Sequence, residues 1–319
     1  SLISFANLLD GKLMRLICSL MILFVLLPVS AQAQKPALEA VMVTEGVYAL
    51  VGETGQRSPE NLGNNATFGA IVTSKGVILI DSGGTARGAA AIHQAIQKIT
   101  NKKIITVINT GGQDHRWLGN DYFRKLGATI ISSAEAVADQ KKRASEQFTA
   151  LGFLVGEKGL AGTKDSHADQ VFDKTLGLTI GGVELHLEHP GPAHTPGDIF
   201  VWLPGKKVMF SGDIVYLDRL LAVTDSSNLK GWIQAYERVA SFKPRHLVPG
   251  HGRPATLEKA RFQTYDYLIN LRDRVQAYLD GGGDAQGSVN VDQSRFKDIL
   301  NFDQLAKRNA QAAYIELEF

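Results

Sequence analysis

The sequence predicts an α+β fold in which two β-sheets pack face to face and helices cover both outer faces, a four-layer αββα sandwich. Three observations predict it. The order strands, helix, strand, helix occurs twice along the chain. Polar, glycine-bearing segments follow several of the strand-like runs, as loops at the end of a sheet would. No short repeat and no low-complexity segment indicates another architecture.

The first half of the chain is predicted from its hydrophobic periodicity. Residues 85–100 carry Ile92, Ile96 and Ile99 at helical spacing, so they form an amphipathic helix. Residues 150–170 are glycine-rich and aperiodic, and we interpret them as a long loop near the functional site. The other expected elements are two short strands within 40–51, a hairpin over 68–81, a buried strand over 104–108, a helix over 118–126, a strand over 128–132 and a polar helix over 134–148.

The second half repeats this order. A hairpin is expected to turn at Gly181–Gly182, and a helix over 228–242 has Ser227 as its predicted N-cap. A long helix over 254–280 should end at the glycines 281–283. The remaining strands are expected over 178–180, 183–189, 199–203, 208–210 and 247–248, and the rest of the chain to residue 319 looks helical.

Composition gives little information about the partners of this chain. The 319 residues are 44% hydrophobic and 21% charged, and 34 basic against 32 acidic residues give a net charge of +2. This balance is typical of a globular protein and gives no electrostatic reason to expect nucleic acid or an anionic membrane as partner. The small-molecule substrate that we expect rests on the motifs described below, and composition leaves the oligomeric state open.

The N-terminal region has the pattern of a secretory signal. Residues 14–33 combine Arg15, an apolar run over 16–29 and a small-residue cleavage site at Ala31-Gln-Ala33. Residues 1–13 precede this signal and are interpreted as an upstream or cloning-derived extension. The predicted mature chain, 34–319, is one domain with a helical C-terminal part over about 254–319. We expect a periplasmic or secreted protein without a stable membrane span after signal cleavage.

Four predicted loops carry the residues suited to chemistry. They are Asn109–Asn120, Gly191–Asp198, Ser211–Asp213 and Pro249–Gly252. Each follows a strand-like run, so the four loops are expected to converge on one site. The only cysteine, Cys18, lies inside the predicted signal. A mature chain without thiolates must hold any metal with histidine and carboxylate.

Together with Asp81-Ser-Gly, the motifs Gly191-Pro-Ala-His194-Thr-Pro-Gly-Asp, Ser211-Gly-Asp213 and Pro249-Gly-His251-Gly resemble the metallo-β-lactamase fold superfamily. The match covers nearly the whole predicted mature chain. Periplasmic members that accompany sulfur oxidation or quinoprotein dehydrogenases are most similar. The resemblance implies a four-layer αββα metallo-β-lactamase-like sandwich and a zinc-dependent hydrolase.

The family's signature, His-x-His-x-Asp-His, is altered in this chain. In a gapless match the first His becomes Gly111, the second Gln113, the Asp becomes His115 and the last His becomes Arg116. A second register matches Asp114-His115 to the Asp-His pair and leaves Thr110 and Gly112 in place of the first two histidines. His115 faces the metal in either register, whereas Asp114 does so in only one.

Counting the ligands that the resemblance implies predicts one metal ion per chain. The first metal position keeps only His194, with Gln113 as a poor amide ligand. The second keeps His115, Asp213 and His251, with Asp114 as a candidate fourth ligand. Two imidazoles and a carboxylate suit zinc, and the same set can hold ferrous iron.

The predicted function is a secreted, mononuclear metallohydrolase in which metal-activated water attacks an ester, lactone, thioester or amide carbonyl. Asp114 or Asp213 would accept the proton, and Arg116 or Gln113 would orient the substrate or stabilise the oxyanion. Arg116 has an equal alternative as the partner of a structural acid. Two other functions stay open: an accessory or binding protein with a degenerate metal site, and a mononuclear-iron oxidoreductase acting on thiols or persulfides.

Several conspicuous residues have structural interpretations. Asp81 is expected to brace neighbouring loop backbone rather than to bind metal. His186 and His189 lie on a predicted strand and are expected to be structural, and Trp117 is expected to pack.

Overall fold

The structure, a computed structural model, describes residues 38–318 and contains two β-sheets. The predicted extension 1–13 and signal peptide 14–33 lie outside the described residues. No helix within residues 38–318 is long and apolar enough to cross a membrane. The described residues belong to one structural unit.

The first sheet has seven strands in sequential order. Strands β1 to β4 form an antiparallel meander, and β4 to β7 run parallel. Helices connect the parallel strands, as parallel pairing requires. The strands are β1 (Glu39–Thr44), β2 (Val47–Val51), β3 (Thr67–Val72), β4 (Val77–Ile80), β5 (Ile104–Ile108), β6 (Thr129–Ser133) and β7 (Gln170–Phe172). The connecting helices are α2 (Ala86–Gln97), α3 (Asp114–Trp117), α4 (Asn120–Lys125) and α5 (Ala134–Leu160).

The second sheet has five strands in the order β12-β11-β10-β9-β8. All neighbours are antiparallel except β11 and β12, which the helix α6 connects in parallel. The elements are β8 (Thr175–Ile180), β9 (Val183–Glu188), β10 (Phe200–Leu203), β11 (Val208–Phe210), the 3₁₀ turn η1 (Gly212–Ile214), α6 (Leu229–Ser241) and β12 (His246–Val248).

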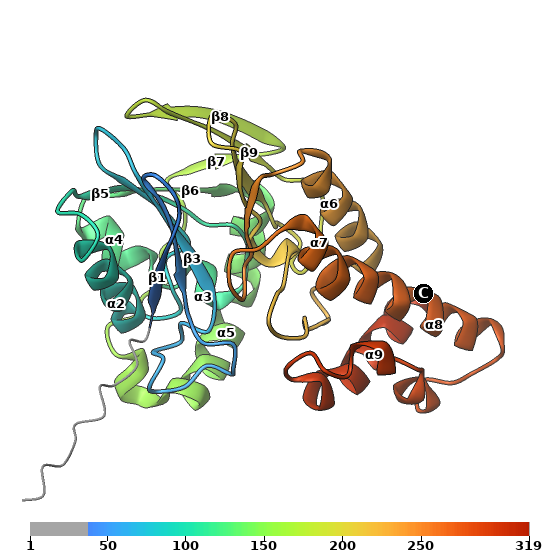
Figure 1. Cartoon of the computed structure of the whole chain (residues 1–319). Coiled ribbons are helices and arrows are strands. Elements are labelled where there is room, and N and C mark those ends of the chain that lie inside the picture. The colour runs from blue at the N-terminus through green and yellow to red at the C-terminus, as the bar shows by residue number, and fades with distance from the viewer. Residues whose placement is uncertain (1–37, 319) are drawn as a thin grey trace, which may run out of the picture. The chain divides into compact units, whose positions relative to one another are not determined.

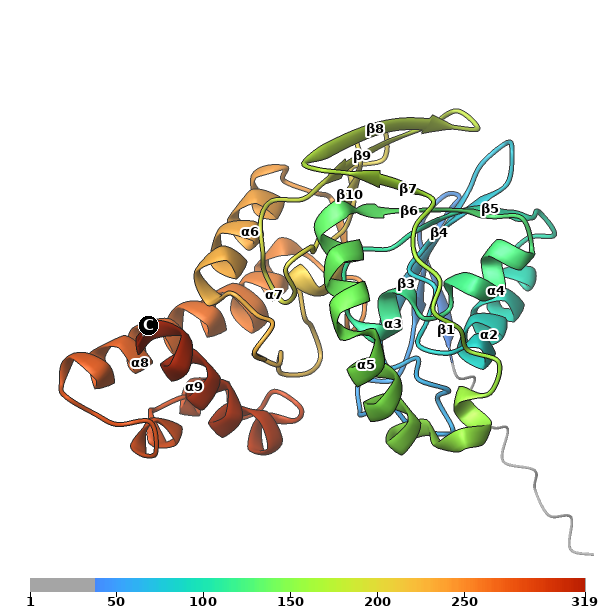
Figure 2. The same ribbon diagram turned by 180° about the vertical axis from the view of Figure 1, so that it is seen from behind.

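The two sheets and their helices form the predicted four layers. Figures 1 and 2 show α2 and α4 on one side of the sheets and α6 on the other. Side chains alternate accordingly along β10, where Val201 packs between the sheets while Phe200 and Trp202 pack toward α6 and the C-terminal helices. The apolar residues thus form separate layers of core, one between the sheets and one beneath the helices on each outer face.

Helix N-caps follow the expected chemistry with one correction. Thr85 caps α2 through its Oγ1, which accepts a hydrogen bond from Gly88 N at 2.8 Å. The N-cap of α6 is Asn228, whose Oδ1 accepts from Gly231 N at 2.6 Å, so the prediction of Ser227 was wrong by one residue. Ser227 instead donates its hydroxyl to His194 O.

The prediction of a long loop over 150–170 was wrong for most of that range. Helix α5 continues to Leu160, with a break at Gly156, where φ is 71°. Leu151 and Val155 pack against Trp117 in a small apolar cluster, and this packing offsets the low helix propensity of the glycines. Strand β7 then begins at Gln170, so only residues 161–169 lack regular structure.

The predicted helix over 254–280 begins later than expected. Ala255 forms a β-bridge with Leu247, and Thr256 caps α7 (Leu257–Ala260). The helix widens into a π-helical segment, η2 (Arg261–Asp266), and continues as α8 (Tyr267–Asp280), which ends at Gly281 as predicted. The 3₁₀ turns η3 (Gly287–Asn290) and η4 (Ser294–Phe296) and the last helix, α9 (Phe302–Glu318), complete the described chain.

Candidate metal centre

Three of the predicted site residues lie together at the carboxyl ends of three strands. His115 is on the short helix α3 that follows β5, Asp213 is in η1 after β11, and His251 follows β12. Gly212 makes the turn before Asp213 possible, because its φ of 51° is in the left-handed region and a Cβ atom there would lie 2.5 Å from Thr110 Oγ1.

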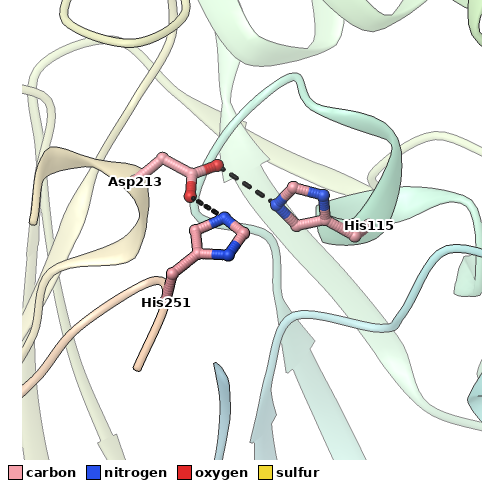
Figure 3. A group of neighbouring side chains, drawn as sticks. All are labelled: His115, Asp213 and His251. Atoms are coloured by element: carbon pink, nitrogen blue, oxygen red, sulfur yellow. Dashed lines mark ion pairs between the residues drawn. The ribbon is translucent and has the colours of Figure 1, made fainter. Parts of the chain in front are cut away.

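Asp213 stands between the two imidazoles. Its Oδ1 lies 3.1 Å from His251 Nε2, and its Oδ2 lies 3.4 Å from His115 Nε2 (Figure 3). All three side chains are buried, and one ligand atom from each lies within 4.8 Å of the other two. This is the only group of three or more metal-ligating residues among the described residues.

The nitrogen atoms that face Asp213 have no hydrogen-bond partner. His115 Nε2 and His251 Nε2 are both buried and unsatisfied. His251 Nδ1 lies 2.8 Å from the carbonyl oxygen of Asn65 and must donate to it, so its Nε2 carries the lone pair. Burial lowers the pKa of His251 well below its usual value and keeps the ring neutral. Two imidazoles whose facing nitrogen atoms are unpaired, together with one carboxylate, fit a divalent cation such as zinc or ferrous iron.

Arg116 holds the carboxylate of Asp213 in place with two hydrogen bonds. Its Nε and Nη2 donate to the two carboxylate oxygens at 3.1 and 2.6 Å, and Nη1 donates to Asp81 Oδ2 at 2.8 Å. Nη1 and Nη2 also donate to the carbonyl oxygens of Thr67 and Gly250. Burial opposes ionisation of Asp213, but Arg116, His115 and His251 together outweigh it and hold the pKa of that carboxyl well below its usual range. Arg116 is fully buried, and every nitrogen of its guanidinium group donates a hydrogen bond within the protein. This geometry fits the predicted role as partner of structural acids and leaves no donor for a substrate.

Asp81 has the bracing role expected for it. Its carboxylate accepts from Thr110 N at 2.7 Å, from Thr110 Oγ1 and from Arg116. It lies outside the three-residue group.

Asp114 contacts the far side of the His115 ring. Its Oδ1 lies 3.1 Å from His115 Nδ1 and accepts from the His115 backbone N at 2.7 Å. Arg57 Nη2 forms an ion pair with the same oxygen and lies 2.7 Å from His115 Nδ1. Burial raises the pKa of Asp114, but Arg57 and His115 outweigh it and hold that pKa below its usual range. Asp114 is therefore ionised, and it lies outside the three-residue group.

His194 and Gln113 face the same cavity as His115 and His251 but do not belong to the three-residue group. His194 packs against the rings of Trp232 and Tyr216, and its buried Nδ1 has no hydrogen-bond partner. Burial lowers the pKa of His194 to about 4, so the imidazole is neutral.

The cavity beside this centre has a volume of about 190 Å³. Sequence reasoning missed several of its residues, because Arg57, Tyr216, Arg219 and Arg308 lie outside every recognised motif or carry no signal of their own. The described residues that line it are Gln56, Arg57, Gln113, His115, His194, Tyr216, Arg219, Ala222, Val223, Thr224, His251, Leu305, Arg308 and Asn309. No residue of 150–170 is among these lining residues.

Comparison with known proteins identifies the family. Residues 63–251, more than half of the chain, match the family model of the metallo-beta-lactamase superfamily. The chain belongs to the metallo-β-lactamase superfamily. The matched range contains all three residues of the metal group.

Two curated proteins that this chain resembles carry names of different activities. A metallo-beta-lactamase type 2 from Elizabethkingia meningoseptica is 28% identical over 191 residues, which is 59% of this chain and 68% of that protein. The 2,4-dinitroanisole O-demethylase subunit alpha from a Nocardioides species is 23% identical over 184 residues, 57% of this chain and 51% of that protein.

Solved metallo-β-lactamase structures share the fold. One from Pontibacter korlensis has a TM-score of 0.59 and 20% identity, and covers 73% of this chain and 99% of its own. The DIM-1 metallo-beta-lactamase has a TM-score of 0.57 and 16% identity, and covers 73% of this chain and 98% of its own. These similarities confirm the predicted α+β sandwich.

Other side chains fill the space beside Gly111 and Gly112, two residues of the altered metallo-β-lactamase signature. A Cβ atom added at Gly111 would lie 2.5 Å from Asp198 Oδ1 and 3.3 Å from Thr195 Oγ1. At Gly112 a Cβ atom would lie 2.0 Å from Asp139 Oδ2. Asp198 and Asp139 are themselves buried and hydrogen-bonded, to Thr195 and Arg143. A histidine at position 111 would therefore have to displace the buried side chain of Asp198.

Proposed function

We propose that this protein is a metal-dependent hydrolase that uses one metal ion, held by His115, Asp213 and His251, to cleave an ester, lactone, thioester or amide of a small molecule. One observation carries the proposal. The unsatisfied Nε2 atoms of two buried histidines face one carboxylate beside a polar cavity. Leaving buried polar atoms unpaired costs free energy, and a bound cation would remove that cost.

When bound, zinc or another divalent cation would polarise a carbonyl group and lower the pKa of a water molecule. The chain supplies the arrangement around it. Arg116 holds both oxygens of Asp213 in place, and the backbone of Asn65 fixes the tautomer of His251. Partners of this kind orient metal ligands and determine their affinity.

Two groups on the cavity are suited to stabilise negative charge on a carbonyl oxygen. Gln113 carries an amide donor, and Tyr216 carries a phenol. Burial raises the pKa of Tyr216 well above its usual value, so the phenol stays protonated and can donate a hydrogen bond. This assigns to Gln113 and Tyr216 the substrate-orienting role for which Arg116 has no free donor.

The two carboxylates near the centre are assigned to orienting and binding the metal ion rather than to accepting a proton. Asp114 and Asp213 are held ionised by Arg57 and Arg116, and their lowered pKa values make them weak proton acceptors. We assign Asp114 the positioning of His115 and Asp213 the binding of the ion. His194 lines the same cavity with an unpaired Nδ1 and stays the predicted ligand of the first metal position.

The relatives do not select the substrate. One is named a β-lactamase and the other an O-demethylase, so the names of the relatives point to different substrates. The signal-like residues 14–33 support a periplasmic or secreted location for the hydrolase.

Two other functions have specific support. Asp198 and Asp139 fill the space beside Gly111 and Gly112, which fits an accessory protein that has lost catalysis. The set of two histidines and one carboxylate also fits an iron-dependent thiol or persulfide oxidoreductase. Absence of turnover with metal bound would favour the first, and bound iron with oxygen uptake on thiol addition would favour the second.

The test is hydrolysis of aryl ester, lactone, thioester and β-lactam substrates by the metal-loaded chain from residue 34. We expect turnover that a chelator abolishes, that zinc restores and that His251→Ala loses. His186→Ala is the matched control, because His186 is exposed on β9 and pairs with Glu184 away from the centre. Equal hydrolysis by wild type and His251→Ala would refute the proposal.

A further inference from the structure

The cavity beside the metal centre is lined by three arginines, two of which form no ion pair within residues 38–318. Arg57, Arg219 and Arg308 all line it, and none of the described lining residues is acidic. Arg57 forms an ion pair with Asp114. Among residues 38–318, no carboxylate forms an ion pair with Arg219 or Arg308, so these two guanidinium groups are the ones left for a ligand.

Arg219 is held at the cavity without being neutralised. Its Nη1 donates to Gly55 O at 3.2 Å, and its Nε donates to Leu220 O at 3.4 Å. These carbonyl oxygens fix the side chain but carry no net charge. Burial, together with the nearby Arg57, lowers the pKa of Arg219, as expected for a half-buried cation without a carboxylate partner.

Arg308 is brought to the cavity by a part of the chain beyond the family match. It lies on α9, whereas the family model ends at residue 251. The neighbouring residue, Asn309, fixes the helix at this point, because its Nδ2 donates to Leu221 O at 2.8 Å and its Oδ1 accepts from Val223 N at 2.9 Å. Asn309 is fully buried, so the position of Arg308 beside the segment 221–224 is well defined.

The side chain of Arg308 is exposed between two cavities, and no ion pair joins it to any residue of 38–318. A second cavity of about 270 Å³ shares Val223, Thr224 and Arg308 with the first. Asp225 lines this second cavity but forms no ion pair with Arg308. Arg308 thus stands at the border of the metal-centre cavity, where an incoming anion would meet it.

We propose that Arg219 and Arg308 form an oxyanion-binding subsite, so that the substrate carries an anionic group such as a carboxylate in addition to the bond that is cleaved. Guanidinium groups suit this role because their planar donors match the geometry of an oxyanion. Positive charge around a cavity also speeds the approach of an anionic ligand. The inference rests on the proposed hydrolase function and adds the substrate class to it.

The test compares two esters of equal length that differ in charge. Mono(4-nitrophenyl) glutarate carries a carboxylate where 4-nitrophenyl valerate carries a methyl group. We expect wild type to have the higher kcat/KM for the charged ester, and this selectivity ratio to fall about tenfold in Arg308→Gln and in Arg219→Gln, with most of the change in KM. The preference should also weaken as salt concentration rises.

Lys307→Gln is the matched control. It removes the same charge from the neighbouring exposed position of α9, and Lys307 does not line the cavity. The ratio should be unchanged in this variant. A wild-type enzyme without preference for the charged ester, or a ratio that is the same in both arginine variants as in wild type, would overturn the proposal.

A binding measurement separates this inference from the hydrolase proposal. Isothermal titration with glutarate itself requires no turnover. If neither ester is hydrolysed but glutarate binds wild type and Lys307→Gln about tenfold more tightly than Arg308→Gln, the subsite stands and the proposed reaction fails. If glutarate binds all three proteins equally or not at all, the subsite fails whether or not the esters are cleaved.

Discussion

The guanidinium group of Arg116 binds the carboxylate of Asp213 with two parallel hydrogen bonds, Nη2 to Oδ1 at 2.6 Å and Nε to Oδ2 at 3.1 Å. Both side chains are buried, and Asp213 faces the two imidazoles of the metal group. Arg116 also binds Asp81, which holds the loop that begins at Thr110. One buried cation therefore connects the strand ends that carry the metal group.

Replacement of Arg116 by Met should strongly destabilise the protein. The change leaves the buried carboxylates Asp81 and Asp213 without their cation, and breaking a buried ion pair in this way costs about 3–5 kcal/mol. We expect a loss of that order in the free energy of unfolding measured by urea denaturation of the metal-free protein. Arg253→Gln is the control: Arg253 pairs with Glu39 on the surface, where about 0–1 kcal/mol is typical. Equal stability losses in the two variants would contradict the role given to Arg116.

Asp114→Asn should weaken metal binding more than it weakens folding. The amide loses the charge that pairs with Arg57 and that faces His115 Nδ1, while its size is kept. Loss of a partner that orients a metal ligand typically costs 10- to 100-fold in metal affinity. Competition with a chromogenic chelator measures the affinity, and thermal unfolding of the metal-free variant measures the fold. A metal affinity equal to wild type would remove Asp114 from the positioning role.

Gly111→His should not create a second metal site. The added side chain meets Asp198 Oδ1 and Thr195 Oγ1 at the base, so it must displace a buried carboxylate. We expect the number of metal ions per chain to stay the same and the stability to fall by about 1–3 kcal/mol, as for other overpacked sites. Gly177→Ala is the control, because no atom lies within 4 Å of a Cβ placed there. A gain of one metal ion in Gly111→His would show that Asp198 does not block the position.

Asp198 should make stability depend on pH near neutrality. Burial, together with Asp213, raises its pKa to about 8 from the ordinary value of 3.8. Between these values the folded state holds a proton that the unfolded state has released, so the contribution of Asp198 to stability falls as pH rises toward 8.

The check compares urea unfolding of wild type and Asp198→Asn, both metal-free, across pH 5 to 8.5. Because the amide does not titrate, we expect wild type to lose stability relative to the variant as pH rises. Exposed Asp173→Asn serves as the control. Curves for wild type and Asp198→Asn that run parallel over the whole range would contradict a raised pKa.

The elements of the fold were predictable because their signals are local. The spacing of Ile92 and Ile96 places the buried face of α2, and both residues are buried beneath it. The end of α5 was not predictable, because its glycines favour a loop and the packing of Leu151 and Val155 on Trp117 is a tertiary contact. The same holds for the start of the helix after residue 254, where a β-bridge from Ala255 to Leu247 takes the place of the first turn.

Sequence alone could predict only those residues of the candidate site that belong to a recognisable motif. His115, Asp213 and His251 stand in glycine-bearing motifs at strand ends, and the structure brings these three together. Arg219 and Arg308 have no such signal. Arg308 reaches the cavity because Asn309 hydrogen-bonds the backbone of residues 221 and 223, a contact across more than eighty positions of sequence. The buried pairing of Arg116 with two carboxylates likewise depends on tertiary structure, which is why sequence reasoning left its role open.

The metal content of the chain from residue 34 tests the central claim most directly. Native mass spectrometry of wild type, His251→Ala and the control His186→Ala should give one zinc or iron ion per chain in wild type and in the control, and none in His251→Ala. Two ions per wild-type chain, no ion in wild type, or an unchanged content in His251→Ala would contradict a single metal ion held by His115, Asp213 and His251.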